Sequence, residues 1–225
     1  MQMKSYLKVR DYIWEKISKG ELKLGDKLPP EREFAEILDI SRNSVREGIK
    51  LLESMGVICS HHGSGNFVSG NFEKMVEEIL TFMFTLNEMK ERQITEFRYG
   101  IEWEAVNIIT GNLTDEMRDK FSYCLSQLDK STTEEEAVNW DKNFHYLIVE
   151  ATDNYYIKTS YLAISKIMDN ILPRLREKII VGMKSHHALR SAHRMMLEGI
   201  IEGNLEKSME GTRNHFNYIM EFQDK

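Results

Sequence analysis

Apolar residues near the start of the chain recur at the spacing of an α-helix. One such stretch covers residues 6–19 and ends at Gly20. Its apolar positions are Leu7, Ile13, Trp14 and Ile17. A turn-rich segment follows, and Pro30 suits the first turn of a second helix. The residues that this short helix is expected to bury are Phe34, Ile37 and Leu38.

A third helix and a hairpin are predicted next. Ser41 suits the N-cap of a helix that ends at Gly56. The apolar stripe of this helix consists of Val45, Ile49 and Leu52. Residues 57–70 then read as a strand, a glycine-rich tip and a second strand. Helix, helix, turn, helix and hairpin in this order predict a winged helix-turn-helix domain over residues 1–70.

The remaining residues, 73–225, contain one proline and helical periodicity throughout. The expected helices cover residues 73–87, 91–110, 114–129, 134–152, 155–171, 173–183, 185–202 and 204–223. Thr114 and Thr133 suit N-caps, and glycine or asparagine follows several of the blocks. We therefore expect a mostly α protein, with an all-α antiparallel helical bundle that a short linker near residues 69–71 joins to the winged domain.

Charge is distributed unevenly along the chain. The net charge of −6 argues at first against a nucleic-acid partner, but residues 1–70 carry 11 Lys and Arg against 10 Asp and Glu. DNA binding requires a local basic surface rather than a basic whole. No apolar run approaches the ~18–20 residues of a membrane span, and the first residues lack the pattern of a signal peptide. Together with two isolated cysteines, Cys59 and Cys124, this predicts a cytoplasmic protein without a membrane partner.

The predicted third helix has a polar face opposite its apolar stripe. Arg42, Asn43, Arg46 and Lys50 lie on that face. Arginine can donate two hydrogen bonds to guanine, and serine hydroxyls reach phosphates or base edges, so the face suits the major groove. The alternative is that this face is merely solvated and the glycines of the hairpin merely form a turn.

The segment LPPEREFAEILDISRNSVREGIKLLESMGVICSHHGSGNFV closely resembles the GntR family of bacterial regulators. The resemblance implies DNA contacts from Arg32, Ser41, Arg42, Ser44, Arg46, His62 and Gly65. Two residues depart from the family pattern: Pro30 stands where serine is usual, and Gly48 where alanine is usual. The glycine costs roughly 1 kcal/mol of helix propensity. Neither departure affects the arginines.

Histidines with apolar neighbours at helical spacing stand out in the second half. Asp141 and His145 are four residues apart, so both project from one helix face. His193 precedes Leu197 and Ile200, and His215 precedes Ile219, at core-facing spacings. One carboxylate and three imidazoles could converge on a divalent metal. The alternative for each histidine is an ordinary core position.

The all-helical second half looks like the FCD effector domain found in FadR-like GntR proteins. Metal-binding members have an aspartate–x3–histidine pair, then a histidine, and another histidine 22 residues later. The resemblance implies the metal ligands Asp141, His145, His193 and His215. Zinc is the first choice, with nickel or manganese possible, because histidine and carboxylate suit these ions.

Arg98 lies in an otherwise apolar stripe. A buried arginine needs an anionic partner. One interpretation is an intramolecular salt bridge to Glu102 or Asp141; the other is that Arg98 and the metal together bind a small carboxylate. The family resemblance favours the second, since FCD domains usually sense organic or sugar acids.

These features predict a homodimeric transcription regulator, not an enzyme, that binds an inverted repeat in double-stranded operator DNA. A small carboxylate would change the population of DNA-compatible head arrangements. Two alternatives stay open: a repressor for which the metal itself is the signal, and a metallo-hydrolase fused to a DNA-binding head. Against the hydrolase, the sequence has no HExxH motif and no nucleophile elbow.

Overall fold

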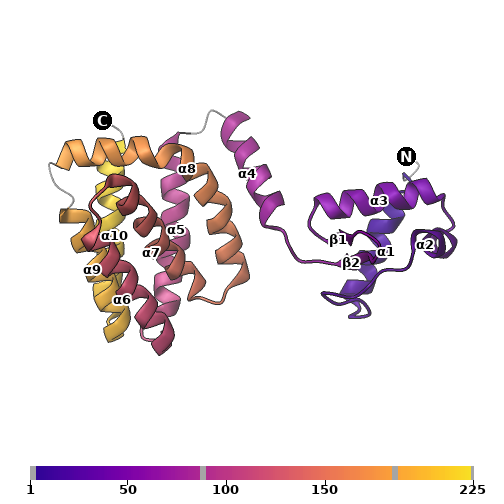
Figure 1. The fold of residues 1–225 in the computed structure, drawn as a ribbon, viewed down its shortest axis with the longest axis horizontal. Helices are drawn as coiled ribbons and strands as arrows, with labels where there is room; N and C mark the ends of the chain where they lie inside the picture. Colours follow the sequence, from indigo (N-terminus) through magenta and orange to yellow (C-terminus); the bar gives the residue numbers. More distant parts are fainter. Residues whose placement is uncertain (1–3, 87–89, 184–186, 224–225) are drawn as a thin grey trace. The chain divides into compact units, whose positions relative to one another are not determined.

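The computed structural model describes residues 4–86, 90–183 and 187–223 (Figure 1). The chain divides into two compact units, Met1–Val76 and Glu77–Lys225. None of the described helices combines the length and the apolar composition that a bilayer crossing requires.

The first unit has the predicted winged helix-turn-helix fold. Its elements are α1 (Leu7–Ser18), α2 (Glu31–Leu38), α3 (Arg42–Ser54), β1 (Ile58–His61) and β2 (Gly65–Val68). The two strands are antiparallel, with Ile58 opposite Val68 and His61 opposite Gly65. The three helices and the hairpin enclose one core, whose fully covered members include Val9, Phe34, Val45 and Ile58.

One expectation about which apolar residues are buried in this unit is wrong. Ile37, which we expected inside, is 48% exposed. In α1, the buried residues are Val9 and Ile13, whereas Trp14 is 72% exposed. In α2, Phe34 and Ala35 occupy the covered face, so Ile37 is turned outward. Helical spacing identifies apolar positions, but the neighbouring helices decide which of them are covered.

The close packing of α3 against α1 explains why position 48 is a glycine. A Cβ atom at this position would lie 2.6 Å from Cβ of Val9 and 2.7 Å from the backbone oxygen of Tyr6. Helix α3 therefore crosses α1 too closely for any side chain at this point. The glycine lowers the helix propensity of α3 but permits the close approach of α3 and α1.

The second unit is a bundle of helices. The elements are α4 (Glu73–Leu86), which starts in the first unit, α5 (Glu91–Ile109), α6 (Asp115–Lys130), α7 (Glu134–Glu150), α8 (Tyr155–Met183), α9 (His187–Glu202) and α10 (Leu205–Gln223). The predicted blocks at 155–171 and 173–183 are one helix, so the expected stop before Pro173 is wrong. Proline removes one backbone donor and bends a helix, but it need not end it. Residues 87 and 185–186 of the predicted blocks lie outside the described residues.

Local signals fix the ends of several of these helices. Thr114 accepts a hydrogen bond from the backbone N–H of Met117, and Thr133 accepts one from Glu136, as predicted for N-caps. Helices α5, α7 and α9 contribute most of one core cluster, and α10 contributes Phe216 and Ile219 to a second. Helix α10 packs against α9, α5 and α8, and α7 packs against α5 and α8. This arrangement brings the inward faces of α5, α7, α9 and α10 to one place.

Candidate functional site

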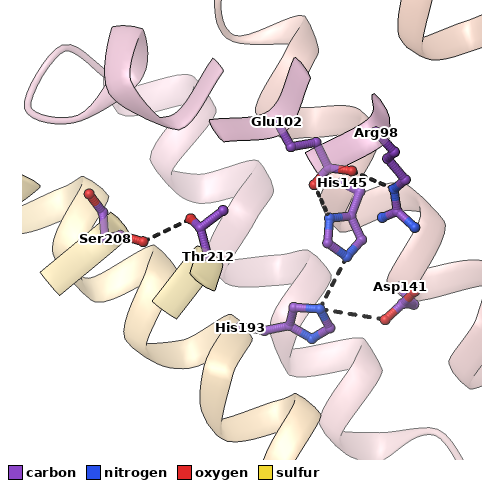
Figure 2. Close-up of polar contacts among 7 residues, drawn as sticks. All are labelled: Arg98, Glu102, Asp141, His145, His193, Ser208 and Thr212. Carbon is purple, nitrogen blue, oxygen red and sulfur yellow. Dashed lines mark hydrogen bonds and ion pairs between the residues drawn. The ribbon is translucent and has the colours of Figure 1, made fainter. Parts of the chain in front are cut away.

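Three histidines meet inside the second unit. His145 comes from α7, His193 from α9 and His215 from α10, and each is at most 1% exposed. One ring nitrogen of each lies within 4.8 Å of those of the other two. The Nε2 atoms of His145 and His193 are 3.2 Å apart (Figure 2). The structure therefore brings together three of the four residues in the predicted ligand set.

Close packing of α10 against α9 brings the histidines together. A Cβ atom at Gly211, one turn before His215, would lie 2.5 Å from the backbone nitrogen of Met196. The glycine thus lets α10 approach α9 closely, which places His215 beside His193 with ring centroids 4.5 Å apart. Phe144 forms another wall, since its ring lies 4.8 Å from that of His193.

Asp141 lies at the edge of the histidine cluster. Its Oδ1 atom is 3.5 Å from Nε2 of His193. It is one turn before His145 on α7, as the i, i+4 spacing predicted. Among the described residues, the group of mutually close metal-ligand atoms contains the three histidines and not Asp141. The carboxylate is therefore a neighbour of the cluster, on the side of His193.

Glu102 also belongs to this site, although the sequence predicted it only as a possible salt-bridge partner of Arg98. Its Oε2 atom is 2.5 Å from Nδ1 of His145, and its Oε1 atom accepts a 2.5 Å hydrogen bond from Nε of Arg98 (Figure 2). Burial alone would raise the pKa of Glu102, but the charge of Arg98 and the hydrogen bond with His145 outweigh burial and hold that pKa below its ordinary value. An ionised carboxylate only accepts hydrogen bonds, so Nδ1 of His145 donates and Nε2 is left facing His193.

Arg98 forms the intramolecular salt bridge that was one of its two predicted interpretations. The residue is 6% exposed. Burial opposes the charge of its guanidinium, but Glu102 and other nearby groups raise its pKa above the usual value. Its guanidinium is 5.4 Å from the ring centroid of Phe216. The bond to Glu102 uses Nε, and Figure 2 shows the terminal nitrogens on the side of Asp141. That edge borders a cavity of about 10 Å³, which has room for one water molecule.

The donor set fits a divalent transition metal. With zinc–nitrogen distances of about 2.05 Å and tetrahedral angles, two ligand nitrogens lie roughly 3.3 Å apart. The distance of 3.2 Å between the Nε2 atoms of His145 and His193 agrees with this separation. Cys124 does not join the set, because burial raises the pKa of its thiol to about 12 and its Sγ contacts the backbone oxygen of Trp140. The chemistry is therefore that of imidazole and carboxylate.

The candidate DNA-contacting residues all lie in the first unit. Arg32 and Arg42 are exposed, and Arg46 forms a 2.8 Å ion pair with Glu31 from α2. Ser41 caps α3, accepting a 3.1 Å hydrogen bond from the backbone of Ser44. At the hairpin tip, His62 and Gly65 line an open groove of about 600 Å³ that also includes Pro30 and Glu31. The structure places the tip of the wing and the start of α2 on one groove.

The fold and the buried site define a class: a winged helix-turn-helix regulator with a helical sensing domain. The family model described as "Bacterial regulatory proteins, gntR family" matches residues 5–68, and the FCD domain model matches residues 93–218. The chain belongs to the GntR family and carries an FCD effector domain. It is thus a DNA-binding transcription regulator.

Known relatives agree with this assignment. A protein of Escherichia coli (strain K12), named as a regulatory protein of the L-lactate dehydrogenase operon, is 24% identical over 216 residues, covering 94% of this chain and 83% of the relative. The transcriptional regulator LutR of Bacillus subtilis (strain 168) is 23% identical over 190 residues, covering 84% and 87%. The solved structure of Streptococcus agalactiae GntR superposes with a TM-score of 0.64 at 20% identity, covering 98% of this chain and all of that one, which shows the shared fold.

Proposed function

We propose that this regulator binds a divalent metal, with zinc as the first choice, through Asp141, His145, His193 and His215. The observation that carries the proposal is the buried histidine cluster, with one nitrogen of each ring within 4.8 Å of the others. Glu102 holds the ring of His145 by a carboxylate–imidazole hydrogen bond, the arrangement that orients metal-bound histidines in proteins. The bound ion would supply a Lewis-acid centre for an anionic ligand.

We further propose that a small carboxylate, an organic or sugar acid, binds between this centre and Arg98. Arg98 uses Nε for Glu102, which leaves the forked edge of its guanidinium for a carboxylate. Since the cavity beside this edge now has room for one water, ligand binding must separate the helices around it. A ligand that requires a different helix arrangement can favour one state of the protein over another.

The output of this change is DNA binding by a homodimer on an inverted repeat. We propose that residues 1–70 form the DNA-binding domain and residues 73–225 the effector and dimerisation domain. The proposed DNA contacts are Arg32, Ser41, Arg42, Ser44, Arg46, His62 and Gly65. An effector with about a 100-fold preference for one state contributes about 2.7 kcal/mol of coupling per site, which is enough to release DNA.

A metal-responsive repressor is the second candidate, and one observation favours it. The salt bridge to Glu102 already provides Arg98 with an anion, so the site is complete without an organic ligand. Operator affinity measured at fixed pH distinguishes the two. If the effector is an acid, zinc-loaded protein changes its operator affinity with the acid; if it is the ion, chelation alone gives a change at least as large.

Elemental analysis tests the metal site itself. Wild-type protein should contain about one transition-metal ion per chain, and the double variant His193→Ala/His215→Ala should contain none. A thermal-shift screen of carboxylic acids on the same zinc-loaded sample then tests the effector. Full metal content in the double variant would remove the proposed site.

A further inference from the structure

Helix α5 has an exposed face opposite the one that carries Arg98 and Glu102. The buried side of the helix packs against α7, α8 and α10. The exposed positions on the other side alternate at spacings of four and three residues, which place them in one line along the helix. Helices that pack against one another in pairs contact through lines of this spacing. We call this line the outer stripe; it consists of Gln93, Phe97, Gly100, Glu104 and Asn107.

Gly100 lies in the middle of the outer stripe. Its backbone is helical without a positive φ, so its conformation does not require glycine, and glycine lowers helix propensity. At Gly48, Gly199 and Gly211, a Cβ atom would lie 2.6, 2.3 and 2.5 Å from an atom of a neighbouring helix. In the part of the chain that the structure describes, no atom outside its own stretch of α5 lies within 4 Å of a Cβ placed on Gly100. The other three glycines thus mark close crossings of two helices, and Gly100 has the same form without a neighbouring helix in the described residues.

Phe97 supplies a side chain that fits the space above such a glycine. It is 48% exposed and lies one turn before Gly100 on the outer stripe. A twofold interface must be complementary to itself, because both molecules present the same surface. When two copies of α5 pack antiparallel about an axis between positions 98 and 99, position 97 of each helix faces position 100 of the other. The aromatic ring of each copy then fills the space that the missing side chain of the other leaves, as a knob fills a hole.

The charge on the outer stripe favours the antiparallel orientation. Glu104 is the one charged member of the stripe. In the antiparallel pair it faces Gln93 of the second copy, whose amide N–H can donate to the carboxylate. The two Glu104 side chains are then roughly 16 Å apart along the helices, from a rise of about 1.5 Å per residue. A parallel pair would place the two carboxylates together and leave a gap between the two glycines, so the stripe matches itself only when the helices are antiparallel.

We propose that α5 packs antiparallel against α5 of a second copy of this chain, with Phe97 of each copy on Gly100 of the other. The inference rests on the proposed function, in which the helical domain forms a homodimer, and adds the surface that joins the two copies. The inner face of the same helix carries Arg98 and Glu102, so the dimer contact and the proposed ligand site share one helix.

Sedimentation velocity on the full-length chain measures the dimer affinity of variants on the stripe. Gly100→Leu puts a side chain into the closest contact and should weaken the dimer by at least about fivefold. Phe97→Ala removes the knob and should weaken it by about fivefold or more. Tyr123 is an aromatic residue on α6 that is 59% exposed, and Tyr123→Ala should leave the affinity unchanged. Wild-type dimer affinity in both α5 variants would overturn the inference.

Gly100→Ala shows whether position 100 is in a contact or in solvent. Alanine is a better helix former than glycine, so both readings expect the monomer, measured by thermal unfolding under dilute conditions, to be at least as stable as the wild-type monomer. A crossing at this position also expects weaker dimerisation, because a methyl group separates the two helices. Increased stability with unchanged dimer affinity would place Gly100 in solvent and overturn the inference.

Disulfide trapping tests the antiparallel orientation. In a Cys59→Ser background, a chain with Gln93→Cys is mixed with a chain that carries Glu104→Cys, and the mixture is oxidised. The mixture should form a linked dimer, because positions 93 and 104 face each other. Each chain alone should not, because identical positions are roughly 16 Å apart and a disulfide spans Cα atoms at about 4.4–6.8 Å. Linking within each single variant and none in the mixture would overturn the antiparallel arrangement.

Failure of the inference and failure of the proposed homodimer give different results. If the wild type is a dimer and the substitutions on α5 leave its affinity unchanged, only the inference is wrong, and another surface joins the copies or another part of the chain covers the stripe. If the wild type sediments as a monomer at micromolar concentration, the homodimer and the inference are both wrong.

Discussion

The two units of the molecule place the same residue types in opposite environments. In the winged domain, Arg42 and Arg46 are exposed on α3, and the contact of Arg46 with Glu31 is at the surface. In the helical domain, Arg98 and Glu102 form their ion pair in the interior. An exposed arginine stays hydrated and contributes little to folding, whereas a buried one depends on its partner.

In the winged domain, the proposed binding residues are therefore distinct from the residues that stabilise the fold. In the helical domain, they are the same residues. Substitutions of exposed residues in the winged domain are therefore expected to change DNA affinity without changing stability. In the helical domain, the residues proposed to hold the metal and the ligand are also part of the core, since Glu102, His145, His193 and His215 are all buried. The proposed sensing site and the stability of its domain are therefore coupled.

The largest effect is expected when the buried ion pair is broken. Arg98→Ala leaves the carboxylate of Glu102 in the interior without its guanidinium, and this should lower the free energy of unfolding by about 3–5 kcal/mol. The matched variant Arg42→Ala should change it by less than about 0.5 kcal/mol. Urea unfolding of the full chain measures both. Similar losses in the two variants would show that burial does not distinguish these arginines.

Removal of one metal ligand should have the next largest effect. Structural zinc sites bind with about 10–16 kcal/mol shared among four ligands, so His193→Ala should weaken zinc binding by roughly 100- to 1000-fold. His61, on the exposed surface of the hairpin, provides the matched control, and His61→Ala should leave zinc affinity unchanged. Competition with a chromophoric chelator gives both affinities. If the two variants bind zinc equally, the buried cluster is not the metal site.

The exposed arginines should affect DNA affinity without affecting metal binding. A bidentate arginine–guanine contact corresponds to roughly 10- to 100-fold in specific affinity, so Arg42→Ala should weaken operator binding by that factor. Arg10→Ala removes the same charge from α1, where Arg10 pairs with Asp11, and should have a much smaller effect. Fluorescence anisotropy with operator and unrelated DNA measures specific and nonspecific binding. An equal loss in both variants would indicate a charge effect alone, and the contact assignment would be wrong.

The two units also differ in what their sequences predict. In the winged domain, the decisive signals are local: Ser41, the stripe from Val45 to Leu52 and the hairpin lie within one short segment, and the structure has the predicted elements there. The error, Ile37, concerns which apolar positions the neighbouring helices cover. Spacing along one helix carries no information on that.

In the helical domain, the elements follow from periodicity, but the site depends on distant contacts. The family spacing predicted the three converging histidines, whereas Glu102 was considered only as a partner of Arg98. Its contact with His145 joins residues 43 positions apart and depends on the packing of α5 against α7. The i, i+4 spacing of Arg98 and Glu102 was the available signal, and it predicted the salt bridge but not the bond to the histidine.

The smallest expected effect compares a helix cap in each unit. Ser41 caps α3 and Thr133 caps α7, each accepting a hydrogen bond from a backbone N–H three residues later. Replacement of either by alanine should lower the stability of its own unit by about 1 kcal/mol. Thermal unfolding followed by calorimetry measures this loss.

Operator affinity then separates the two caps. Thr133→Ala should leave DNA binding unchanged, because α7 lies in the helical domain. Ser41→Ala should weaken it several-fold, since the cap fixes the start of the helix that presents Arg42 and the serine is itself a proposed DNA contact. Ser41→Asn distinguishes these two reasons, because asparagine caps a helix equally well but places a bulkier side chain at the DNA surface. If Ser41→Asn restores stability but still binds DNA weakly, the serine hydroxyl itself contacts DNA. If the variant restores both stability and operator affinity, Ser41 acts as the helix cap.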